Sequence, residues 1–176
     1  DKGMLAPLNE YIEAAGIETV LRQLHGKNIP GCIACMKCWE KKDGHCVVKN
    51  DMLNEIMDKM VAADGMLIGS PTYFANVTSN IKSIIDRAGM VALANGYALA
   101  RKVGAAVVAV RRGGAIAVFD AINHFYFINQ VVVPGSSYWN LGRGLSPGDV
   151  EKDEEGMQTM DNLGKNMAWV LQKLNG

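Results

Sequence analysis

Apolar positions along the chain recur at two spacings, one typical of helices and the other of strands. The helical spacing of three and four residues marks the segments 4–16, 51–63, 76–89, 115–128 and 155–174. Alternating or continuous apolar runs bounded by turn residues mark strands at 17–24, 65–70, 102–110 and 131–136. Helical and extended segments alternate, and this order predicts a parallel sheet with helices on both faces.

Single residues sharpen several of these boundaries. Gly16 and Gly89 stand where two of the helical patterns end, and glycine is favoured just past a helix C-terminus. Asp51 stands where a side-chain cap would start the next helix. The run 102–110 is almost wholly apolar, which is typical of a central parallel strand covered on both faces.

The order of elements lacks one strand. A doubly wound sheet of this size usually begins with a central strand and a turn into its first helix, whereas this chain opens on the helical pattern at 4–16. A sheet without its middle strand would leave buried backbone groups unpaired. We therefore expect that strand and its turn to precede Asp1.

The composition favours one domain, residues 1–176, with a sizeable core. Lysine plus arginine and aspartate plus glutamate both number 18, so the formal net charge is zero. This balance gives no electrostatic reason to expect a nucleic acid or an anionic membrane as partner. No apolar run is long enough to span a bilayer, and the opening stretch DKGMLAPLNEYIEAAG lacks the pattern of a secretory signal. These features predict a cytoplasmic protein.

All four cysteines lie in one stretch, GCIACMKCWEKKDGHC, at residues 31–46. Clustered thiols in a reducing compartment indicate metal binding or redox work rather than loop stapling. The spacing C-x-x-C-x-x-C matches the start of the bacterial ferredoxin run, whereas zinc sites usually come as two separated C-x-x-C pairs. Seven residues separate Cys38 from Cys46, and Gly44 lets the chain turn back. The alternatives are an iron–sulfur cluster, a zinc ion, or four reduced thiols that hold no metal.

Four stretches of the chain carry a family resemblance: CIACMKC, ADGMLIGSPTYFANVTSNIKSIIDRAG, VRRGGA and VVVPGSSYWNLGRGLSPGD. They resemble the NADPH-dependent FMN reductase family and, within it, the iron–sulfur flavoproteins. The resemblance implies a flavodoxin-like, doubly wound parallel sheet and a bound FMN. It also implies a 4Fe–4S cluster on Cys32, Cys35, Cys38 and Cys46. The family's first strand and phosphate-binding turn have no counterpart here, so the residues that would hold the FMN phosphate are not named.

Two loops that follow predicted strands are the candidate flavin contacts, because ligands of open α/β sheets lie beyond the carboxyl ends of the strands. The first loop contributes Ser70, Pro71, Thr72, Tyr73, Phe74 and Asn76, and the second contributes Arg111, Arg112, Gly113 and Gly114. The first offers short hydrogen-bonding side chains and aromatic surface. The second offers cations, which favour negative charge on a reduced flavin, and glycines that let backbone approach a ligand. The alternative is that both are ordinary polar turns, with the aromatic side chains in the core.

Together these features predict an FMN-dependent oxidoreductase or electron-transfer flavoprotein, with an NAD(P)H-dependent FMN reductase as the expected enzyme class and no catalytic residue named. NAD(P)H, ferredoxin or a quinone-like molecule would be the electron donor or acceptor. We expect a homodimer or homotetramer, in which the long loop 138–156 covers the flavin of another copy. An alternative of a different class is a flavin-free, zinc-binding interaction domain on the same scaffold, because fold does not dictate function.

Overall fold

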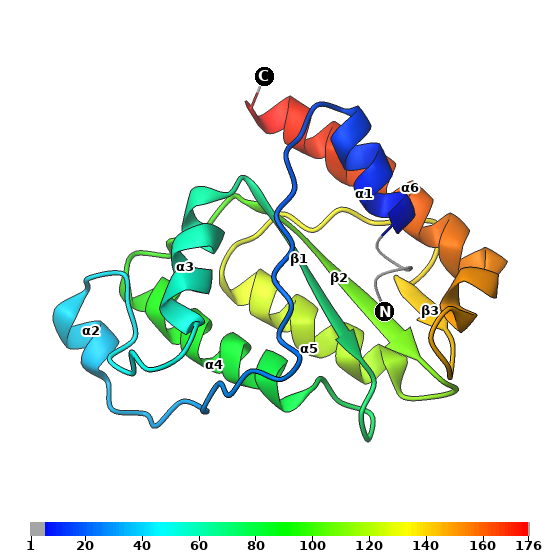
Figure 1. Cartoon of the computed structure of the whole chain (residues 1–176). Coiled ribbons are helices and arrows are strands. Elements are labelled where there is room, and N and C mark those ends of the chain that lie inside the picture. The colour runs from blue at the N-terminus through cyan, green and yellow to red at the C-terminus, as the bar shows by residue number, and fades with distance from the viewer. Residues whose placement is uncertain (1–5, 176) are drawn as a thin grey trace.

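Three parallel strands form the sheet in the computed structural model, which describes residues 6–175. They are β1 (Gly65–Pro71), β2 (Val103–Val110) and β3 (Leu141–Arg143). The strand order is β1-β2-β3, and β2 pairs in parallel with both neighbours. The strands predicted at 65–70 and 102–110 are therefore confirmed, and the carboxyl ends of all three strands lie at the same edge of the sheet (Figure 1).

Helices cover both faces of the sheet, as predicted. They are α1 (Ala6–Ala14), α2 (Lys37–Lys41), α3 (Leu53–Ala62), α4 (Ser79–Ala94), α5 (Ala115–Ile128), the short 3₁₀ helix η2 (Asp149–Lys152) and α6 (Glu154–Asn175). Figure 1 shows α1 and α6 side by side against one face, with α4 and α5 against the other. The helices predicted at 51–63, 115–128 and 155–174 are confirmed, with ends that differ by at most two residues.

Alternation along β2 divides the core into two clusters. Ala106 and Val108 belong to a cluster with apolar residues of α3, α4 and α5. Ala105 and Val107 belong to a second cluster with α1 and α6. Because successive side chains of a strand point to opposite faces, β2 is buried on both sides. This is the physical reason for the unbroken apolar run at 102–110.

The helix α4 differs from its expected bounds of 76–89 at both ends. It begins later, because Thr78 is extended and caps the helix: its Oγ1 accepts a hydrogen bond from Ile81 N at 3.4 Å. Gly89 lies inside the helix rather than at its end. A Cβ at this position would lie 3.7 Å from the ring of Phe125, which is an ordinary contact, so packing against α5 does not require a glycine here.

The strand predicted at 17–24 is wrong. The segment is irregular and belongs to no ladder, and Val20 and Leu21 are 58% and 52% exposed. An extended segment becomes a strand only when a neighbouring strand exchanges backbone hydrogen bonds with it. Within residues 6–175, no strand does so.

The strand predicted at 131–136 is also wrong. Val132 alone bridges β2: Gly104 N donates to Val132 O (2.9 Å), and Val132 N donates to Lys102 O (2.8 Å). Pro134 has no N–H with which to continue the ladder. The chain pairs with β2 again only at β3.

Two expectations concern residues beyond those that the structure describes. The strand and turn expected before Asp1 precede the sequence, and residues 4–5 of the helix predicted at 4–16 lie outside the described range. Within residues 6–175, β1 pairs on one edge only, with β2.

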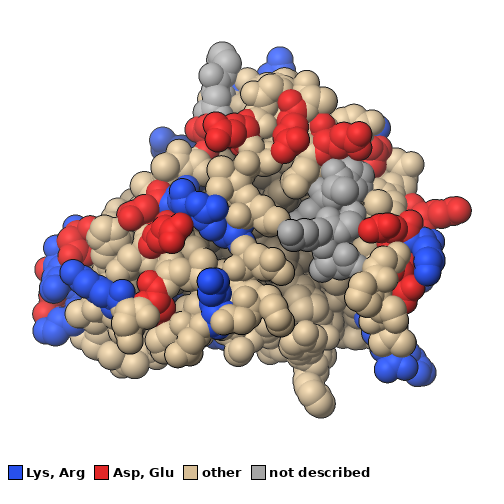
Figure 2. Space-filling model, in the orientation of Figure 1, with Lys and Arg blue, Asp and Glu red and all other residues tan. Residues whose placement is uncertain are grey.

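Charged side chains of both signs are interspersed on the face of the molecule shown in Figure 2. This distribution accords with the zero net charge, and the row of acidic groups across the upper part of Figure 2 would repel a polyanionic partner. None of the helices in the described range is both long and apolar enough to cross a membrane.

Candidate functional site

A tight hairpin follows β1 at the carboxyl edge of the sheet. Tyr73 and Asn76 exchange two backbone hydrogen bonds of 3.0 Å, and Phe74 and Ala75 between them have φ of 48° and 56°. Positive φ at both central positions is the property of a type I′ turn. The side chain of Phe74 is fully exposed at the tip, and Tyr73 is 62% exposed. The aromatic pair therefore projects from the sheet and is not part of the core.

Two hydroxyl groups at the base of the hairpin behave differently. Ser70 is buried, and its Oγ donates to Pro71 O (2.8 Å) and accepts from Thr78 N (3.1 Å), which ties the loop to the start of α4. Thr72 N donates to Ala109 O of β2 (2.8 Å), while its buried Oγ1 has no partner within the described residues. An unpaired buried hydroxyl costs about 1–3 kcal/mol. Thr72 Oγ1 lacks a partner among residues 6–175, but because it is buried a ligand would reach it only if the hairpin moved.

The loop after β2 touches this hairpin. Gly114 has φ of 88° and caps α5. A Cβ at this position would lie 2.8 Å from Ala75 Cβ and 3.3 Å from Thr72 Cγ2. The structure thus brings the two candidate flavin loops into contact, as their positions after neighbouring strands predict.

The other candidate flavin residues lie exposed on either side of this contact. Pro71 ends β1, and Asn76 Oδ1 accepts from Val77 N (2.9 Å). Residues 111–113 follow β2 and are exposed. An unpaired hydroxyl, two aromatic side chains and two arginines thus gather at one edge of the sheet. This set of groups fits a planar ring with polar edges that gains negative charge on reduction.

Three residues of the cysteine loop that are not glycine have a left-handed backbone conformation. Ala34 and Met36, on either side of Cys35, have φ of 51° and 56°, and Lys42 after α2 has φ of 50°. Such conformations are uncommon for residues other than glycine and cost roughly 1–3 kcal/mol each. Contacts from the rest of the molecule must therefore hold the loop in this shape.

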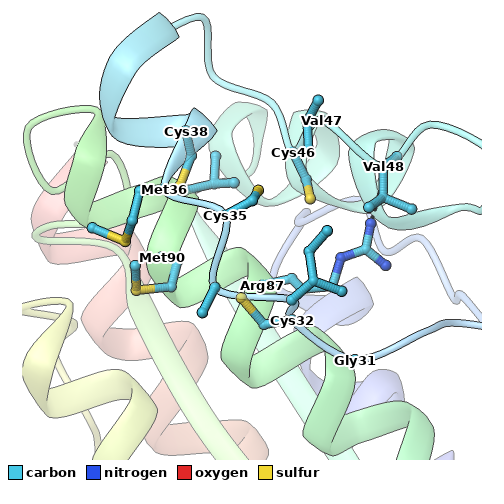
Figure 3. A pocket seen from close by; sticks show the side chains of 13 residues that line it. Gly31, Cys32, Cys35, Met36, Cys38, Cys46, Val47, Val48, Arg87 and Met90 are labelled. Atoms are coloured by element: carbon cyan, nitrogen blue, oxygen red, sulfur yellow. Dashed lines mark hydrogen bonds between the residues drawn. The ribbon is translucent and has the colours of Figure 1, made fainter.

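All four cysteines line one cavity, which Figure 3 shows from close by. They are Cys32, Cys35, Cys38 and Cys46, and their thiols are free. Among residues 6–175, no three His, Cys, Asp or Glu side chains are placed to hold a single metal ion. A 4Fe–4S cluster bonds each thiolate to a different iron atom, so its ligands surround a cavity instead of meeting at one point. Convergence of the four sulfurs on a cluster stays a prediction.

A buried ion pair lies beside this cavity. The side chains of Arg87 and Asp51 are each 1% exposed. The N-cap of α3 is Met52, not Asp51 as predicted, although Asp51 Oδ1 accepts from Leu53 N at 2.9 Å from one residue before the cap. Burial acts to lower the pKa of Arg87, but its interactions with Asp51 and with the Cys46 side chain outweigh it and raise that pKa. The guanidinium is therefore charged. Its Nε is buried without a partner in the described part of the chain, so the cavity wall fits a negatively charged group.

Side chains of α3 and α4 hold the end of the cysteine loop. Cys46 N donates to Asn54 Oδ1 (2.8 Å), and Asn54 Nδ2 donates to Cys46 O (3.0 Å). Gly44 N donates to Asn95 Oδ1 at the end of α4 (3.0 Å). The fourth cysteine is thus positioned by two helices rather than left on a free loop.

No role at the site was predicted for Arg87 or Asn54, although Arg87 belongs to a stretch that carries the family resemblance. Arg87 lies three residues after Ile84 and four before Val91, both of which are buried. A charge at an inward-facing position of a helix was therefore an available signal. Asn54 carried no comparable signal, because its partner lies in an irregular loop.

The parallel sheet with polar and aromatic loops at its carboxyl edge is the fold of a flavodoxin-like protein. Solved structures share this fold. RosB with bound 8-demethyl-8-formylriboflavin-5'-phosphate superposes with a TM-score of 0.74 at 19% identity, covering 98% of this chain and 72% of that one. A flavodoxin from the domain Archaea gives a TM-score of 0.60 at 16% identity, covering 97% of this chain and 90% of that one. These likenesses confirm the predicted fold.

Sequence comparison is more specific. An iron-sulfur flavoprotein of Methanocaldococcus jannaschii is 37% identical over 168 residues, which cover 92% of this chain and 84% of that protein. An iron-sulfur flavoprotein of Methanosarcina thermophila is 32% identical over 165 residues, which cover 93% and 83%. Residues 2–145 match the sequence model of the NADPH-dependent FMN reductase family, and the chain belongs to this family. It is an FMN-dependent oxidoreductase or electron-transfer flavoprotein, as predicted.

Proposed function

We propose that this chain is an electron-transfer flavoprotein that binds FMN at the carboxyl edge of its sheet and a 4Fe–4S cluster in the cysteine cavity. The observation that carries the proposal is that every cysteine of the chain lines the same cavity. Its relatives in Methanocaldococcus jannaschii and Methanosarcina thermophila are named iron-sulfur flavoproteins, which supports it. When bound, FMN would supply the exchange of one or two electrons and the cluster the exchange of one.

At the proposed flavin site, residues of this chain would bind the ring, orient it and place positive charge beside it. Thr72 Oγ1 would gain the hydrogen-bond partner that it lacks within the described residues. Gly114 keeps the second loop against the hairpin, and Tyr73 offers an exposed aromatic face. Arg111 and Arg112 would favour the negative charge of a reduced flavin.

We propose NAD(P)H as the electron donor, with ferredoxin as the protein alternative and a quinone-like molecule as an acceptor. The segment 138–156 is not a long loop as expected, because it contains β3, η2 and the start of α6. In the proposed homodimer or homotetramer, the irregular parts of this segment in one copy cover the flavin of another. Tyr138 and Trp139, at its start, are exposed aromatic side chains that suit such a contact. The proposed location is the cytoplasm, where thiols remain reduced.

Anaerobic purification, followed by reconstitution with iron, sulfide and FMN, tests the proposal. We expect about one FMN per chain, and iron and sulfide in the equal amounts of a 4Fe–4S cluster. Cys46→Ala should lose iron and sulfide but keep FMN. Thr72→Val should weaken FMN binding about three- to tenfold, the effect of one hydrogen bond, and keep the cluster.

Lys41→Ala is the matched control, because Lys41 is exposed in the same loop as the cysteines. This variant should keep both cofactors. A protein that takes up zinc instead of iron, or that shows no cluster absorbance after reconstitution, would contradict the cluster. If Thr72→Val leaves the Kd for FMN unchanged, the proposed flavin site is contradicted.

A further inference from the structure

Arg87 joins the two ends of the cysteine loop. Its Nη1 donates to Pro30 O (3.0 Å), which precedes the first cysteine, and its Nη2 donates to Val48 O (3.1 Å), which follows the last one. Asp51 receives hydrogen bonds from both nitrogens. With two carbonyl groups and a carboxylate around it, the guanidinium has a fixed position and orientation.

One N–H of this guanidinium remains for another group. Nε is buried and has no partner among residues 6–175. Arg87 lines the cavity together with the four cysteines, whereas Asp51 is not among the lining residues. Figure 3 shows the guanidinium at the wall of this cavity, on the side of Val48. The positive end of the buried ion pair therefore faces the thiols.

We propose that Arg87 is a positioning residue for the cluster: it closes the base of the cysteine loop, holds Cys46, and raises the reduction potential of the bound cluster. The inference rests on the proposed function, because it requires that the cavity holds a cluster. It adds a role for a residue that is not itself a ligand.

The physical basis is the charge of the cluster. Reduction adds one electron, taken from an external reductant, to a group that its four thiolates already make negative. A nearby positive charge lowers the free energy of the reduced form more than that of the oxidised form, and the effect is larger where water is excluded. An arginine keeps its charge at every pH that proteins experience. Its contribution to the potential is therefore permanent.

Asn54 provides a control that separates positioning from charge. It holds the backbone of Cys46 through two hydrogen bonds and carries no charge. Asn54→Ala should therefore shorten the lifetime of the cluster, measured as iron retained over time after reconstitution. It should leave the reduction potential unchanged.

The experiment compares reconstituted holoproteins in dithionite titrations followed by electron paramagnetic resonance. The test variant is Arg87→Gln with Asp51→Asn, which removes both charges and leaves hydrogen-bonding side chains in their places. We expect its ratio of reduced to oxidised cluster at a given potential to fall about tenfold, equivalent to about 59 mV for one electron. Arg87→Lys, which keeps the charge, should have a potential close to that of the unchanged protein.

The outcomes separate this inference from the proposed function. If the unchanged protein assembles no cluster, the proposed function fails. If it assembles a cluster and the neutral double variant has the same potential and the same iron retention, the role of Arg87 is overturned. Should the double variant fail to fold, Arg87→Lys decides, because it lacks the Nε donor. Faster loss of iron at an unchanged potential supports the inference, and full retention of iron overturns it.

Discussion

Gly114→Ala tests the contact between the two flavin loops. An alanine with φ of 88° would lie in the left-handed region, which costs roughly 1–2 kcal/mol for a residue with a side chain. Its Cβ would also lie 2.8 Å from Ala75 Cβ and 2.9 Å from Ala75 Cα, so the hairpin must move, and overpacking of this kind costs about 1–3 kcal/mol. We expect the free energy of unfolding to fall by about 2–5 kcal/mol. Displacement of the hairpin should also forfeit about 1.4 kcal/mol of FMN binding, which is a tenfold rise in Kd.

Two measurements check this prediction. Urea unfolding followed by tryptophan fluorescence gives the free energy of unfolding, and quenching of FMN fluorescence gives the Kd. Gly135→Ala is the matched control, because Gly135 is exposed, its added Cβ would meet nothing within 4 Å, and its backbone is not left-handed. Both quantities should then stay within about 0.5 kcal/mol of the unchanged protein. A Gly114→Ala variant that matches Gly135→Ala in stability and in affinity would refute the reasoning.

Other positions give predictions about stability that urea unfolding or calorimetry can check. Arg87→Ala should lower the free energy of unfolding by about 3–5 kcal/mol, because it leaves the buried carboxylate of Asp51 without its partner. A loss below about 1 kcal/mol would mean that the pair is solvated. Gly104→Ala should cost about 1–3 kcal/mol, since its Cβ would lie 2.7 Å from Val131 Cγ1 inside the core. Phe74→Ser should change stability by less than about 0.5 kcal/mol, because the side chain is fully exposed, and a large loss would show that the hairpin tip is covered.

The central strand and most helices were predictable because their apolar spacing reports burial directly. The run 102–110 is buried on both faces, and the pattern at 115–128 coincides with α5. The segments 17–24 and 131–136 have the same apolar and β-branched character but form no strands. Strand formation also needs a neighbour with free backbone groups, and a local pattern carries no information about that neighbour.

The candidate site was predictable as far as topology decides it. Loops that follow adjacent parallel strands must meet at one edge, and Gly114 does lie against the hairpin. The cysteine spacing likewise pointed to one shared cavity. The support around these groups was not predictable, because Arg87 and Asn54 act through contacts with irregular segments. Such contacts depend on how the loop folds back on α3 and α4, which no periodicity reports.

Helix α4 connects the two candidate sites physically. Its first turn is tied to Ser70 through Thr78 N, and its last residue is followed by Asn95, which holds Gly44. The helix has 16 residues and is about 24 Å long at 1.5 Å per residue. It therefore acts as a spacer of fixed length between the hairpin and the cysteine loop. Lengthening or shortening it by one turn would change the distance between the two sites by about 5.4 Å, and with it the path that electrons travel within one copy of the chain. Every residue proposed to contact either cofactor would keep its identity.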